Sequence, residues 1–123
     1  MILGIGTDLA QISRIQKALD TSGARFVERV LSPLEQADAP NPMTASWLAK
    51  RWAAKEAAAK ALGCGIGAQA GFNDFVTGHT PEGVPTLQLA GAAKQTSQGQ
   101  GVWHLSLSDD GDFAQAFVIW SIA

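Results

Sequence analysis

Cysteine is nearly absent from this chain of 123 residues, since Cys64 is the only one. A single cysteine excludes an intramolecular disulfide and a cysteine-rich zinc site. The two histidines, His79 and His104, have no partner at the spacing of a metal site or a catalytic triad. Ser106 and Ser108 lack the surroundings of a nucleophile elbow, so acyl hydrolysis has little support.

Long apolar runs are also missing, because no stretch approaches the roughly 20 residues that a membrane span needs. The N-terminal "MILGIGTDLA" has no basic segment ahead of an apolar run and a cleavage site, so no secretory signal is expected. We therefore expect a soluble, cytoplasmic protein. The length predicts one domain over residues 1–123, with a surface-to-volume ratio that oligomerisation would improve.

Positive charge is scarce in the second half of the chain. Residues 1–62 hold eight Lys/Arg against six Asp/Glu, whereas residues 63–123 hold one against five. Cations clustered in a mildly acidic protein suggest a local anionic ligand or partner, while the net charge of -2 argues against general nucleic-acid binding. The alternative is that these cations lie on solvated helix faces.

Hydrophobic spacing predicts an α+β fold. We expect a strand at 2–7, a helix at about 10–19 and a second helical piece within 23–37 that breaks near Pro33. A longer helix is expected at about 45–62, capped by Thr44 or Ser46 and stopped by Gly63. Since this helix is apolar on more than one face, we expect it to be largely buried.

The second half of the chain is predicted to consist mainly of strands. Residues 72–77 and 84–91 are strand candidates around the turn-rich "GHTPEG", and 92–99 suggest a short helix. Residues 102–108 alternate strictly, "DDGD" is a turn, and 113–122 make a returning strand. The sequence therefore predicts a small antiparallel sheet with a C-terminal hairpin, packed on the long central helix.

Two carboxylates stand out from this pattern. Glu56 shares one side of the central helix with small residues and Lys60, and Asp8 follows the glycine-bearing first strand. Two carboxylates with cations nearby suit a hard cation, most simply Mg²⁺, which completes its shell with water and substrate phosphates. The residues leave simpler alternatives open: an i,i+4 pair of Glu56 with Lys60, and Asp8 as a turn former.

Two further segments could contribute to a site. The glycine run "GCGIG" at 63–67 follows a helix instead of opening one, so it is neither a Walker loop nor a dinucleotide fingerprint, and a helix cap with a turn is its simpler reading. The segment "HLSLSDDGD" at 104–112 could hold a general base, although a buried His104 could equally be a hydrogen-bonded structural residue.

Four stretches together resemble a known family. "GIGTDLAQISRI" at 4–15, "LAKRWAAKEAAAKALGCGIG" at 48–67, "GVPTLQLAG" at 83–91 and "HLSLSDDGDFAQAFVI" at 104–119 have the order and spacing of a holo-acyl-carrier-protein synthase. The resemblance covers nearly the whole chain. The length of the chain is also similar to that of the short, single-domain phosphopantetheinyl transferases. It implies the 4′-phosphopantetheinyl transferase fold, working as a trimer with active sites between subunits.

The resemblance also implies a reaction, in which 4′-phosphopantetheine moves from coenzyme A to a serine of apo-acyl carrier protein, leaving adenosine 3′,5′-bisphosphate. It assigns Asp8 and Glu56 to Mg²⁺ beside the coenzyme's pyrophosphate, and Lys60 to a phosphate. The resemblance further assigns coenzyme contacts to the loop and turn glycines and the proline that follows, namely Gly63, Gly65, Gly83 and Pro85. Arg51 and Lys55 stay open as structural or partner-facing residues.

For the carrier, which is small, acidic and helical in this family, the resemblance implies docking on Arg14, Arg25 and Phe26. Trp52 stands where the family commonly has Phe, so we expect an apolar contact there. Many members carry His where this chain has Asp109, so the base for the serine proton is Asp109, a water bound by Glu56, or His104.

Two other classes of function remain as alternatives. One is a non-catalytic α+β module that binds an anionic nucleotide or an acidic helical protein, which would not require both Asp8 and Glu56. The other is a divalent-metal phosphohydrolase, for which we would expect more carboxylate or histidine ligands.

Overall fold

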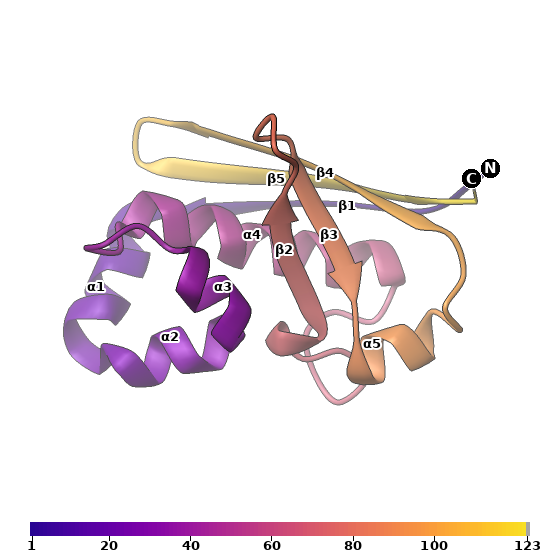
Figure 1. The fold of residues 1–123 in the computed structure, drawn as a ribbon, viewed down its shortest axis with the longest axis horizontal. Helices are drawn as coiled ribbons and strands as arrows, with labels where there is room; N and C mark the ends of the chain where they lie inside the picture. Colours follow the sequence, from indigo (N-terminus) through magenta and orange to yellow (C-terminus); the bar gives the residue numbers. More distant parts are fainter. Residues whose placement is uncertain (123) are drawn as a thin grey trace.

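Three strands form the main sheet, in the order β1-β5-β4 and antiparallel throughout: β1 (Ile2–Gln11), β5 (Phe113–Ser121) and β4 (Val102–Asp110). The computed structural model describes residues 1–122. A separate two-stranded sheet pairs β2 (Phe75–His79) with β3 (Pro85–Leu89). The predicted α+β fold, its antiparallel sheet and its C-terminal hairpin are confirmed (Figure 1).

Helix α4 (Ala45–Leu62) has the bounds that its sequence predicts. The Thr44 side chain caps it by accepting a hydrogen bond from the Trp47 N–H at 3.2 Å, and Gly63 ends it in the left-handed conformation at φ 91°. Alanines dominate its buried positions, which lie on several of its faces. Helix α4 is therefore the central core helix, running along one face of the main sheet (Figure 1).

Two glycines bring β1 exceptionally close to α4. A Cβ on Gly4 would lie 1.9 Å from the carbonyl oxygen of Ala61, and one on Gly6 would lie 1.8 Å from that of Ala57. No other residue type fits at these positions without moving the strand away. Because strand side chains alternate, Asp8 points to the same face of the sheet, toward α4.

The first strand is longer than predicted. Asp8 pairs with Ala116 in the middle of the β1–β5 ladder, so its predicted place at a strand end is wrong. Sheet pairing with β5 extends to Gln11 and overrides the weakening effect of the glycines. Ala10 and Gln11 therefore belong to β1, and the first helix, α1 (Ile12–Ser22), starts two residues later than expected.

Three short helices occupy one end of the molecule (Figure 1). Helix α1 is followed by α2 (Ala24–Val30) and α3 (Pro33–Asp38), so the predicted break near Pro33 is present. Ser32 and Glu35 form a reciprocal capping box at the start of α3. Helix α1 has no cap from its own N-terminal residue; instead the Asp112 carboxylate accepts hydrogen bonds from the N–H and hydroxyl of Ser13, at 3.0 and 2.7 Å.

Between α4 and β4 lie the β2–β3 hairpin and α5 (Gly91–Thr96). The hairpin and the short helix were predicted, but residues 72–74 form a 3-10 turn (Phe72–Asp74) instead of the start of a strand. The Asp74 carboxylate explains the turn, since it accepts from the Gly71 N–H at 2.9 Å. Within residues 1–122, no helix has the length and apolar character needed to cross a membrane.

Candidate functional site

Asp8 and Lys60 form an ion pair where β1 crosses the last turns of α4. The Lys60 Nζ donates to Asp8 Oδ1 at 3.1 Å and to the Thr7 carbonyl oxygen at 3.0 Å. The Asp8 side chain is 16% exposed and that of Lys60 is 53% exposed, so the pair lies at the surface with the carboxylate recessed. The close approach of β1 at Gly6 places Asp8 within reach of the helix.

Glu56, one helical turn before Lys60, belongs to the same cluster. Burial and the negative charge of Asp8 raise the pKa of Glu56 above its ordinary value, and the positive charge of Lys60 opposes the rise. Glu56 therefore interacts electrostatically with both Asp8 and Lys60. The simpler reading of an ion pair between Glu56 and Lys60 is wrong for the described residues, because Lys60 turns to Asp8 instead.

This pair of acids fits a hard divalent cation. Two carboxylates, one partly buried and carrying an unfavourable charge, are what Mg²⁺ uses when water and phosphate oxygens fill its other positions. Residues 1–122 contain no cluster of three or more His, Cys, Asp or Glu side chains suited to a metal, so a cation between two carboxylates would need water and substrate oxygens to complete its shell.

The glycine loop begins directly beyond these charges. Gly63 donates its N–H to the Ala59 and Lys60 carbonyl oxygens at 3.1 and 3.0 Å, and the N–H of Gly65 also reaches the Ala59 oxygen, at 3.2 Å. Gly65 has a φ of 68°, and a Cβ at either glycine would meet nothing within 4 Å. The loop thus leaves open space beside Lys60 at the C-terminal end of α4.

Gly83 and Pro85 lie elsewhere. They border a cavity of about 390 Å³ together with Leu107 and the basic side chains Lys50, Arg51 and His79. Arg51 precedes Gly63 by twelve residues of helix, about 18 Å along its axis. Within one chain, the structure does not bring the turn and the glycine loop together. Lys50, which the sequence did not single out, adds a cation to this cavity.

Asp109 is also remote from the acid pair. Its Oδ2 accepts from the Ser46 hydroxyl at 2.8 Å and lies 3.6 Å from the Lys50 Nζ. The hydrogen bond from Ser46 and the charge of Lys50 hold the pKa of Asp109 below its ordinary value. Because Ser46 and Glu56 are ten residues apart on α4, about 15 Å separates the two regions.

Both histidines are exposed, which was expected for His79 but not for His104. His104 was considered as a buried structural residue, but it is exposed, with Nε2 3.1 Å from the Ser121 hydroxyl. Leu105 points inward from the next position of β4, so His104 points away from α4 and from Glu56. His79 is exposed as expected, and its Nε2 lies 3.2 Å from Asp38 Oδ1.

The three residues expected to dock a carrier lie on one surface. Arg14 and Phe26 border a hollow of about 290 Å³, and Arg25 and Phe26 border a neighbouring one of about 430 Å³. Trp52 closes the first hollow by packing on Phe26, with ring centroids 5.8 Å apart, so its expected apolar contact is present. Arg29, also on the second hollow, was missed, although its i,i+4 spacing from Arg25 could have indicated it.

Of the two residues left open, Lys55 is structural. It is 0% exposed and forms an ion pair of 2.6 Å with Glu35. Arg51 stacks over the Trp47 ring at 4.4 Å and also borders the cavity at Gly83.

Comparisons with known proteins agree on one family. The model of the 4′-phosphopantetheinyl transferase superfamily matches residues 4–119. A holo-[acyl-carrier-protein] synthase from Vibrio parahaemolyticus is 48% identical over 121 residues, covering 96% of each chain. The crystal structure of the synthase from Neisseria meningitidis matches with a TM-score of 0.86 and 39% identity, over 98% of this chain and 99% of that one.

A second solved structure was determined with a ligand. The synthase from Bacillus anthracis, in complex with CoA (3′,5′-ADP), has a TM-score of 0.84 and 34% identity, over 100% of this chain and 99% of the other. Similarity in both sequence and structure thus extends over almost the full length of each protein. The chain is therefore a member of the 4′-phosphopantetheinyl transferase superfamily, in its group of holo-acyl-carrier-protein synthases.

Proposed function

We propose that the protein transfers the 4′-phosphopantetheine group of coenzyme A to a serine hydroxyl of apo-acyl carrier protein in a Mg²⁺-dependent reaction. The products are holo-acyl carrier protein and adenosine 3′,5′-bisphosphate. The observation that carries this proposal is the meeting of Asp8, Glu56 and Lys60 beside an open glycine loop. The relatives, named for the same activity, support it.

The reaction forms one bond and breaks one. The serine oxygen attacks the phosphorus next to the pantetheine arm, and the bond from that phosphorus to the bridging oxygen breaks, leaving its electron pair on adenosine 3′,5′-bisphosphate. Asp8 and Glu56 would hold Mg²⁺, which neutralises diphosphate charge when bound. Lys60, half exposed and anchored by Asp8, can turn its Nζ to a phosphate oxygen.

A proton must also leave the serine. Of the three candidate bases, His104 points away from the acids, and Asp109, whose pKa is lowered by the hydrogen bond from Ser46 and the charge of Lys50, is a weaker proton acceptor than an ordinary carboxylate. Glu56 belongs to the acid pair itself, so a water that it holds would lie beside the attacked diphosphate. We therefore assign proton removal to a water held by Glu56.

We further propose a trimer whose sites lie between subunits. The large apolar side chains exposed on strands β1 and β5 include Ile5, Leu9, Phe113 and Phe117. These four lie on the face of the sheet that α4 does not cover, since Gly6 and Ala116 point to the helix. A neighbouring copy packed there would also allow the turn at Gly83 in one chain to serve the acids of another.

Mixing two inactive variants tests the shared site. We expect Glu56→Gln and Gly83→Val each to be inactive, the latter because valine is strained at a φ of 90°. Co-refolding both would restore activity if one site takes residues from two chains. A mixture as inactive as its parts, in folded trimers, contradicts the shared site.

The proposed activity itself is tested by following the nucleotide product. The protein is incubated with coenzyme A, MgCl₂ and an apo-acyl carrier protein, and adenosine 3′,5′-bisphosphate is quantified by chromatography. We expect release that depends on the carrier and on the metal. Binding of both substrates without release would instead support the non-catalytic module.

A further inference from the structure

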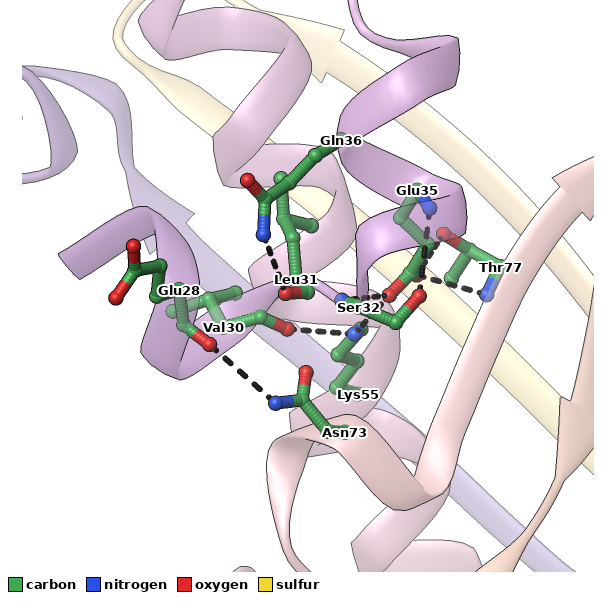
Figure 2. A network of polar contacts seen from close by, with 9 residues as sticks. All are labelled: Glu28, Val30, Leu31, Ser32, Glu35, Gln36, Lys55, Asn73 and Thr77. Atoms are coloured by element: carbon green, nitrogen blue, oxygen red, sulfur yellow. Dashed lines mark hydrogen bonds and ion pairs between the residues drawn. The ribbon is translucent and has the colours of Figure 1, made fainter. Parts of the chain in front are cut away.

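A buried ion pair lies next to the site, on a different face of α4, since consecutive helix residues point about 100° apart. Lys55 immediately precedes Glu56, yet its side chain is fully buried, and its Nζ donates to Glu35 Oε1 and to the Val30 carbonyl oxygen, each at 2.6 Å. Figure 2 shows Lys55 reaching from α4 toward the end of α2 and the start of α3.

Glu35 connects this lysine to a third element. Its Oε1 accepts from the Ser32 N–H at 2.9 Å, and its Oε2 accepts from the N–H and the hydroxyl of Thr77, at 2.9 and 2.6 Å. Thr77 belongs to β2 (Figure 2). No buried side-chain polar atom of the described residues lacks a partner, so the network is complete.

The bond to Thr77 lies on the free edge of the small sheet. Among residues 1–122, strand β2 pairs with β3 alone, and the Thr77 N–H donates to Glu35 instead of to a strand. The carboxylate thus takes the place of a neighbouring strand and ties the hairpin to α3 and, through Lys55, to α4. Two residues after Thr77 is His79, which borders the cavity of Gly83 and Pro85.

Stability alone is a poor reason for this arrangement. A buried ion pair must offset the cost of removing two charges from water, and apolar residues of similar volume often stabilise a protein equally well. The charged groups instead fix geometry, because the two oxygens of Glu35 accept hydrogen bonds from different elements and so hold these elements in one relative position.

We infer that Lys55, Glu35 and Thr77 form a positioning network, which holds the β2–β3 turn at the distance from α4 that binding the nucleotide end of coenzyme A requires. This inference rests on the proposed function, in which Gly83 and Pro85 contact the coenzyme. The network acts on coenzyme affinity and leaves the chemistry at Asp8 and Glu56 unchanged.

Thr77→Val is the smallest change that tests the network. It removes the hydrogen bond from the Thr77 hydroxyl to Glu35 and keeps the one from the backbone N–H. We expect the KM for coenzyme A to rise about tenfold, as for loss of a hydrogen bond to a charged group, with kcat and the KM for the carrier unchanged. Thr77→Ser should restore the wild-type KM. The control is Thr96→Val, which removes a hydroxyl at the end of α5 that donates to the carbonyl oxygens of Ala92 in the same helix and of Gln69 in the loop after α4, away from the network.

Calorimetric titration with adenosine 3′,5′-bisphosphate separates this inference from the transfer reaction. If Thr77→Val weakens nucleotide binding and Thr96→Val does not, the inference stands even in a protein that transfers nothing. It is overturned if folded Thr77→Val binds the nucleotide like wild type, or if the wild type does not bind it. The pair Glu35→Gln with Lys55→Met, neutral and of similar volume, should show the same loss of affinity in a folded protein.

Discussion

Gly6 lies against Ala57 so closely that a Cβ on the glycine would fall 1.8 Å from the alanine carbonyl oxygen. This contact joins the two elements that carry the acids, because Asp8 is two residues beyond Gly6 on the same face of β1, and Glu56 directly precedes Ala57. The distance between β1 and α4 therefore sets the distance between the two carboxylates.

Gly6→Ala should destabilise the protein and weaken its activity together. The added methyl group must push β1 away from α4, and overpacking of this kind costs about 1–3 kcal/mol. Urea unfolding measures the loss. Gly67→Ala is the control, since a Cβ there meets nothing within 4 Å; equal stability of the two variants would contradict the role of the close contact.

Magnesium alone should stabilise the folded protein. Burial and the negative charge of Asp8 both raise the pKa of Glu56, and a cation between the two carboxylates would offset both effects, so MgCl₂ should raise the Tm without any substrate. Glu56→Gln should reduce that increase. Because the pKa is raised, protons compete with the metal at a higher pH than for an ordinary glutamate, and the increase should fade as the pH drops. The same increase in wild type and variant would remove Glu56 from the metal site.

The positions of these acids were only partly predictable from the sequence. Helical spacing placed Glu56 and Lys60 on one side of α4, and its bounds were predicted from Thr44 or Ser46 as the cap and Gly63 as the stop. Pairing across the sheet was not visible, since Asp8 lies in the middle of β1 only because β5 extends the ladder to Gln11. Long-range pairing of this kind overrides local propensity.

Acid should unfold the protein partly through Glu35. Burial would raise the pKa of this carboxyl, but the charge and hydrogen bond of Lys55, together with the hydrogen bonds from Thr77 and Ser32, outweigh burial and hold the pKa below the ordinary 4.5. Since the folded pKa is the lower one, its contribution to stability is present above pH 4.5 and is lost as the pH falls toward the folded value.

The variant Glu35→Gln with Lys55→Met isolates this effect. Unfolding in urea at a series of pH values should show a shallower loss of stability in acid than the wild type shows, because the variant has no carboxyl at this position. Identical acid profiles would show that Glu35 does not control the loss.

Carrier turnover should fall as salt rises. Arg14 and Arg25 are exposed beside the half-buried Phe26, and attraction between them and an acidic carrier is screened over about 10 Å at 0.1 M salt. Arg14→Ala should raise the KM for the carrier and weaken its salt dependence. Lys94→Ala, an exposed cation on α5, is the matched control and should change neither; equal effects of both variants would contradict a local docking surface.

Contacts between distant segments account for most of what the sequence did not reveal. Asp112 caps α1 from the turn between β4 and β5, ninety-nine residues away from Ser13, and Glu35 reaches Thr77 across forty-two residues. Neither contact leaves a local pattern in the chain. The basic cavity at Gly83 likewise combines side chains from α4, β2 and β4, so Lys50 was not singled out.

The mass of an acyl carrier protein tests the central claim most directly. Wild-type protein, coenzyme A and MgCl₂ should add the mass of one phosphopantetheine group to an apo-carrier, and a carrier whose acceptor serine is replaced by alanine should stay unchanged. Folded Glu56→Gln should add nothing. An unmodified carrier after incubation with folded wild type, with Mg²⁺ or with Mn²⁺ in its place, would contradict the account.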